Sequence, residues 1–109
     1  MLAGSAQWLF AVKLGRTHLA LGEAAEAGRV VAAAAATYPE LPWPHLIAGQ
    51  AALAQGQARA ASESLLRALA INPYDPSVHC SLAEAFRQLP DVSAEKRARA
   101  ERDCRELRQ

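Results

Sequence analysis

Three histidines and two cysteines are the residues in this chain whose types could bind a metal ion or take part in catalysis. His45 and His79 occupy equivalent places in a repeating pattern, and His79 directly precedes Cys80. Adjacent residues on a helix point about 100° apart. Apart from chance neighbours, no histidine has a second His, Cys or carboxylate four residues away, the spacing at which one face of a helix presents two metal ligands. We therefore expect these histidines to pack between helices, and we expect no catalytic residue, no metal and no cofactor.

The two cysteines, Cys80 and Cys104, are expected on different helices with no special reason to face each other. We interpret them as free thiols, which favours a reducing compartment and a cytoplasmic location. The N-terminal apolar run lacks a basic start and is interrupted by Lys13, so it is a poor signal peptide. No window of about 18 apolar residues exists, which predicts no membrane span.

Residues 95–108 contain six of the twelve Lys and Arg residues, although the net charge of the whole chain is only +1. One interpretation is a solvated terminal helix. In it, Glu95 with Arg99 and Glu101 with Arg105 form ion pairs, and the inner side carries Ala100, Cys104 and Leu107. The alternative is an arginine face for RNA or an acidic ligand. Interleaved acids and the lack of a stacking aromatic favour the first interpretation, so nucleic acid is an unexpected partner.

The composition and the turn residues predict an all-α fold. The chain has 109 residues, 51% of them apolar with alanine the commonest, and only 6 Gly and 6 Pro, as in a helical globular domain. Glycine and proline interrupt it at Gly22, Pro39, Gly56, Pro73 and Pro90. Helices are expected over about 5–20, 23–36, 44–54, 58–70, 75–88 and from about 93 onward.

The same pattern of small residues returns at one fixed step along the chain. Gly15 corresponds to Gly49, Gly22 to Gly56, and Pro39 to Pro73. Three copies fill the chain as one domain, residues 1–109, divided into 8–41, 42–75 and 76–109. Because Gly15 and Gly49 lack a Cβ once per copy, we expect a partner helix to approach closely there.

This pattern resembles the tetratricopeptide repeat family, whose period of about 34 residues equals the step from Gly15 to Gly49. The first copy reads Ala11-x2-Leu14-Gly15-x2-His18, then Ala27-x3-Val31, Ala34 and Pro39, and the second matches with Leu65 in the Phe place. The third copy departs from the pattern, because Glu95, Arg99 and Arg102 stand where Ala, Phe and Ala belong. The resemblance implies an α-solenoid of three antiparallel helix hairpins, wound as a right-handed superhelix.

The resemblance also implies a concave groove lined by the first helix of each hairpin, and hence a non-enzymatic adaptor that binds a protein partner. The expected occupant is an apolar peptide segment or an amphipathic helix, with Trp43 and Leu46 as anchors. The apolar contact set comprises Leu9, Val12, Leu19, Trp43, Leu46 and Leu53. The residues expected to set direction and specificity are Arg16, Gln50, Glu84 and Arg87.

Two aromatic residues near the N-terminus, Trp8 and Phe10, have no upstream repeat to cover them. We expect them either to pack against a second copy in a homodimer or to continue into a longer array. A structural subunit that uses the groove and this edge for homo-oligomerisation is therefore a further alternative. A large apolar patch left uncovered would be unusual on a soluble monomer.

Overall fold

Six helices make up the described part of the chain, which in the computed structural model is residues 3–108, with side chains described for residues 7–108. They are α1 (Ala3–Ala20), α2 (Ala24–Thr37), α3 (Pro42–Ala54), α4 (Ala58–Ile71), α5 (Pro76–Arg87) and α6 (Ala94–Leu107). No strand occurs within residues 3–108, and the expected all-α class is confirmed. The first helix begins at Ala3, two residues before its expected start at about residue 5.

The turn residues act as their chemistry predicts. Gly22 and Gly56 both have φ of +78°, the left-handed conformation that favours glycine, and each ends the turn after the first helix of its hairpin. The Asp75 carboxylate accepts a hydrogen bond from the Ser77 amide at 2.9 Å, which caps α5. Ser93 caps α6, because its hydroxyl accepts a hydrogen bond from the Lys96 amide at 3.2 Å.

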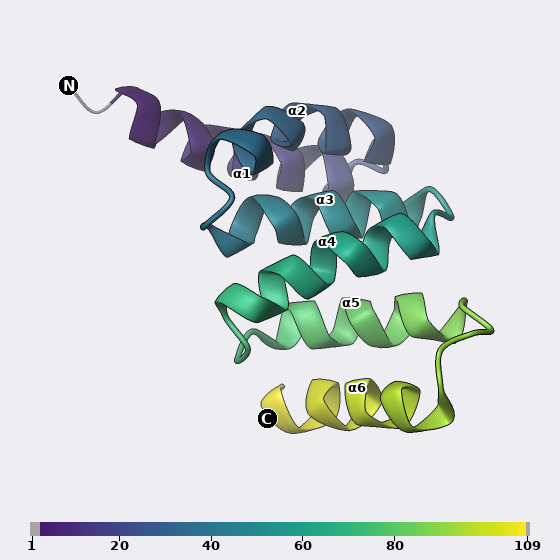
Figure 1. Ribbon diagram of the computed structural model, residues 1–109. Coiled ribbons are helices and arrows are strands. Elements are labelled where there is room, and N and C mark those ends of the chain that lie inside the picture. The colour runs from purple at the N-terminus through teal and green to yellow at the C-terminus, as the bar shows by residue number, and fades with distance from the viewer. Residues whose placement is uncertain (1–2, 109) are drawn as a thin grey trace.

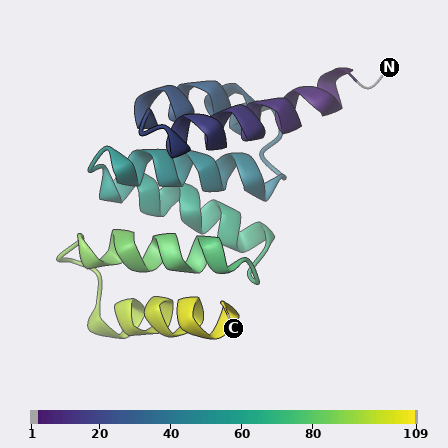
Figure 2. The same ribbon diagram turned by 180° about the vertical axis from the view of Figure 1, so that it is seen from behind.

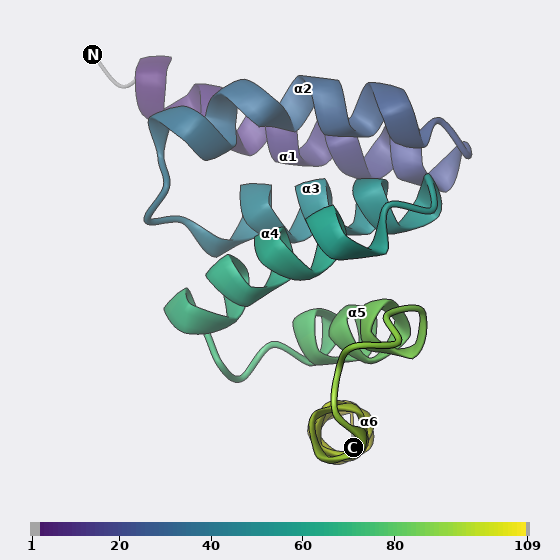
Figure 3. The ribbon, with the colours of Figure 1, turned by 45° about the vertical axis from the view of Figure 1, so that its right-hand side comes forward.

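The helices lie one after another along the long axis of the molecule, from α1 and α2 at one end to α6 at the other (Figures 1 and 2). The principal extents are 47, 25 and 23 Å, so the molecule is elongated. Each helix packs against the next in sequence, and α3 also contacts α1 and α5. The stack is twisted, because the view that shows α6 end-on shows α1 and α2 lying across the picture (Figure 3).

Two glycines allow close packing within the first two hairpins, and one of them also allows it between these hairpins, as the sequence predicts. A Cβ built on Gly15 would lie 2.8 Å from Cγ1 of Val31 and 2.9 Å from Cγ2 of Ile47. A Cβ on Gly49 would lie 2.6 Å from Cγ of Leu65. These distances are shorter than any normal carbon contact, so only glycine allows helices α1 and α3 to approach their neighbours this closely.

The third hairpin departs from the step that relates the first two. Residues 88–93 connect α5 to α6, whereas only residues 55–57 connect α3 to α4, and the longer loop changes which side of the second helix faces inward. Ala100 is buried and Cys104 and Leu107 are half-buried, as the expected inner stripe requires. Glu95, Arg99 and Arg102 are exposed, so the three charges at the family's apolar positions point to solvent.

The two cysteines form a disulfide, and the expectation of free thiols is wrong. Cys80 lies in the first half of α5 and Cys104 near the end of α6, and because the two helices run antiparallel the hairpin places them opposite each other. Their Cα atoms are 4.6 Å apart, a separation that a disulfide can bridge. The argument for a reducing compartment rested on free thiols and loses its basis.

Candidate functional site

The side of the molecule built from α1, α3 and α5, which we call the odd-helix face, is where the expected contact residues lie. Besides the core contacts, a ring stack and a hydrogen bond join its helices. The rings of Trp8 and Trp43 stack with centroids 5.3 Å apart and planes 13° from parallel, joining α1 to α3. The Gln50 amide donates to the Ser81 hydroxyl at 3.4 Å, joining α3 to α5. The three helices therefore form one continuous surface.

The six apolar residues of the expected contact set fall into three groups. Leu9 and Trp43 are exposed, at 44% and 37%. Leu19 and Leu53 are half-buried against the core. The remaining two, Val12 and Leu46, are respectively 2% and 4% exposed.

Val12 and Leu46 belong to the core and offer no surface to a partner, which corrects their assignment as contacts. Val12 clusters with Val31 of α2 and Ile47 of α3. Leu46 lies in the cluster that contains Leu65 of α4 and Val78 of α5. The two occupy equivalent places in the first and second repeats. One error in predicting which side of the helix faces the groove therefore assigned both residues to the surface.

The four polar residues expected to set specificity have different surroundings. Arg16 is exposed, and Gln50 is half-buried by its bond to Ser81. Arg87 lies 3.3 Å from the carboxylate of Glu84 and 3.8 Å from that of Glu101 on α6. Arg87 thus links α5 to α6, and its charge is already matched by two acids.

The aromatic residues at the N-terminal end differ in how far the chain itself covers them. Trp8 is half-buried beneath its stack with Trp43, so a second copy is not needed to cover it. Phe10 is 69% exposed. Among residues 7–108, the exposed apolar surface at this end therefore includes Phe10, Leu9 and the outer part of Trp43.

The histidines have structural hydrogen bonds. Nε2 of His45 donates to the Pro39 carbonyl at 2.9 Å, and Nε2 of His79 donates to the Pro73 carbonyl at 2.7 Å. The same bond therefore recurs one repeat later. His18 lies 2.7 Å from the Glu23 carboxylate. Among the described residues, no three His, Cys, Asp or Glu side chains gather closely enough to hold a metal ion.

The charged helix α6 does not make the ion pairs expected within it. Between residues 3 and 108, no ion pair joins Glu95 to Arg99 or Glu101 to Arg105. Glu101 reaches across to Arg87 instead. The exposed arginines of α6 are thus spread over its surface with acids between them.

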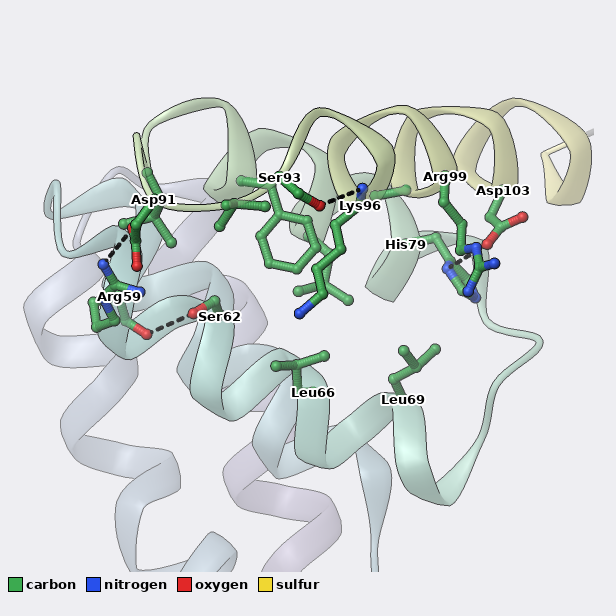
Figure 4. Close-up of a pocket in the computed structure, with 15 residues that line it drawn as sticks. Arg59, Ser62, Leu66, Leu69, His79, Asp91, Ser93, Lys96, Arg99 and Asp103 are labelled. Carbon is green, nitrogen blue, oxygen red and sulfur yellow. Dashed lines mark hydrogen bonds and ion pairs between the residues drawn. The ribbon is translucent and has the colours of Figure 1, made fainter.

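A pocket that the sequence did not predict lies between α4, α5 and α6, and its volume is about 460 Å³. Helices α4 and α6 do not pack on each other, and α5 lies beside both. Figure 4 shows Lys96 extending from α6 toward α4, where Leu66 and Leu69 lie. Leu66 and Leu69 stand one repeat after Ala32 and Ala35, so a change from small to large apolar residues was the available signal.

None of the helices within residues 3–108 combines the length and the apolar character needed to cross a membrane. A comparison with known protein families finds no match to the chain, and a comparison with curated proteins finds none either.

Proposed function

We propose that this chain is a non-catalytic interaction module of the tetratricopeptide-repeat type, which binds an apolar segment of a partner protein on the odd-helix face. The observation that carries the proposal is the pair of stacked tryptophans, Trp8 and Trp43, beside the exposed Leu9. Trp43 has its ring orientation held by the stack while more than a third of its surface stays open. A rigid, partly exposed tryptophan is the type of side chain that dominates protein interfaces.

Local features that recur from one repeat to the next support the solenoid part of the proposal. The left-handed turns at Gly22 and Gly56 are one such pair, and the histidine bonds to Pro39 and Pro73 are another. Stacked helix hairpins of this kind present their first helices side by side, which suits an extended or helical ligand. After Val12 and Leu46 are assigned to the core, the proposed contacts are Leu9, Arg16, Trp43, Gln50 and the outer parts of Leu19 and Leu53.

The test selects peptides that bind the purified chain from a random library and then measures their affinity for two variants. Trp43→Ser should weaken binding about 30-fold, since interface tryptophans contribute about 2 kcal/mol or more. The matched control is Tyr74→Ser, because Tyr74 is another exposed aromatic, at 76%, outside the odd-helix face. Equal weakening by both variants, or none by Trp43→Ser in the folded protein, would contradict the proposal.

Two alternatives give different results in the same experiment. Light scattering that shows a dimer in the wild type, and a monomer after Phe10→Ser, would favour homo-oligomerisation through the N-terminal end. Selected ligands that are all acidic, with affinities that fall steeply with salt and depend on Arg102 and Arg105, would favour binding along α6.

A further inference from the structure

We infer that the pocket between α4, α5 and α6 binds a small amphiphile that carries one carboxylate on an apolar body. This site is separate from the odd-helix face and independent of the function proposed for it. The argument rests on three features of the pocket: its apolar lining, its two unpaired cations and its volume.

The apolar part of the pocket comes from all three helices and from the loop between α5 and α6. Leu66 of α4 is 46% exposed, and Leu69 and Phe86 are half-buried around it. The first and second repeats have Ala32, Ala35 and Ala52 at the places of Leu66, Leu69 and Phe86. The large apolar surface is thus a property of this junction and not of the repeated hairpin in general.

The charges at the pocket are unevenly matched. Arg59 bonds to Asp91 at 2.7 Å, so these two charges match each other. Asp103 lies 3.8 Å from Nδ1 of His79, which is charged only when the ring is protonated, so Asp103 remains as one acid at the pocket. Lys96 and Arg99 have no acidic partner within the part of the chain that the structure describes. In Figure 4, Lys96 extends from α6 toward Leu66 of α4, and Arg99 extends toward His79. Lys96 and Arg99 exceed Asp103 by one positive charge, and this excess beside apolar surface favours an anionic group on the ligand.

The volume of the pocket, about 460 Å³, suits a small molecule. Pockets for small molecules span about 300–1,000 Å³ and are mostly apolar with a few polar groups. A single-chain carboxylate therefore fits the pocket, with its chain against Leu66, Leu69 and Phe86 and its carboxylate at Lys96 and Arg99.

The experiment is calorimetric titration of the disulfide-bonded chain with decanoate, and with decanol as the uncharged ligand of equal chain length. Decanoate should bind more tightly than decanol. The double variant Lys96→Gln, Arg99→Gln should weaken decanoate about tenfold or more and leave decanol unchanged, since a charge-assisted hydrogen bond is worth about one decade in Kd. Between octanoate and decanoate, affinity should rise roughly tenfold, because two more methylenes are buried.

Matched controls separate the pocket from general charge and hydrophobicity. The double variant Arg102→Gln, Arg105→Gln removes two cations from α6 outside the pocket. Leu21→Ser removes an exposed leucine outside the pocket, whereas Leu66→Ser removes an exposed leucine that lines it. Of these three, only Leu66→Ser should weaken decanoate. The inference is overturned if decanoate does not bind, if decanol binds as tightly, or if the controls weaken binding as much as the pocket variants. Binding of an acidic amphipathic peptide in place of decanoate would also overturn it.

Discussion

The second and third hairpins follow the same plan but are held together by different means. In the second, Ala61, Leu65 and Ala68 of α4 are completely buried in a core shared with α3 and α5, and Gly49 allows close contact between α3 and α4. In the third, Ala100 is the only residue of α6 that is buried among those described, and a disulfide joins α6 to α5. A helix with too few apolar side chains to be held by burial is here held by a covalent bond and surface charges.

The largest effect should come from removing the disulfide. The bond closes a sequence separation of 24 residues, and loop entropy predicts a loss of about 3 kcal/mol in the free energy of unfolding for the Cys80→Ser, Cys104→Ser variant. Urea denaturation measures that loss. Hydrogen exchange should then show faster exchange in α6 than in the wild type, with α3 and α4 almost unaffected.

Reduction of the wild type by dithiothreitol is the control, because it breaks the same bond without a substitution. It should reproduce the exchange pattern of the double variant. Equal loss of protection in α4 and α6 would mean that the two hairpins unfold together. That result would contradict the proposed difference in how the two hairpins are held together.

The second prediction concerns the close contact that distinguishes the second hairpin. Gly49→Ala places a Cβ 2.6 Å from Cγ of the fully buried Leu65, so overpacking should cost about 1–3 kcal/mol. Gly28→Ala is the matched control, because its Cβ would lie 3.6 Å from that of Ala51, an ordinary contact. Within a helix this control should stabilise by up to about 1 kcal/mol. Thermal unfolding of both variants checks the opposite signs.

The third prediction uses a bond that the two hairpins share. His45→Phe and His79→Phe each remove the Nε2 donor to a proline carbonyl and keep a ring of similar shape. Each should lower the free energy of unfolding by about 1 kcal/mol, the net value of such a bond. Chemical denaturation of the two single variants gives both values. A loss at only one position would show that the repeated geometry is not equally important in both hairpins.

The sequence predicts the helices and the tight contacts well because these depend on local signals. Gly15, Gly49 and the turn glycines act through backbone geometry that the repeating pattern displays directly. The disulfide and the burial of Val12 and Leu46 depend on how far each helix is rotated about its own axis relative to its neighbours. The repeating pattern does not determine that rotation to better than a fraction of a turn. The α4–α5–α6 pocket depends on the longer 88–93 loop, which interrupts the repeat.

The smallest expected effect on stability should come from disrupting the ion pair that joins α4 to the 88–93 loop. A hydrogen bond from Arg59 to Asp91, 2.7 Å long, lowers the pKa of the Asp91 carboxyl. A carboxyl group whose pKa is lowered by folding stabilises the folded state at pH values above its unfolded pKa of about 3.9. This stabilisation is lost as the pH falls through the lower pKa of the folded state. The Tm of Asp91→Asn should therefore lie slightly below that of the wild type at neutral pH.

The difference between the two Tm values should shrink as the pH falls through the lowered pKa of folded Asp91, and it should vanish once Asp91 is protonated in both the folded and unfolded states. Both groups are fully exposed, so added salt should also reduce the difference at neutral pH. Glu40→Gln, at an exposed carboxylate outside this pair, should show no such pH-dependent difference. A difference for Asp91→Asn that persists in acid would mean that Asp91 stabilises the loop through its backbone conformation and not through the charge of Arg59.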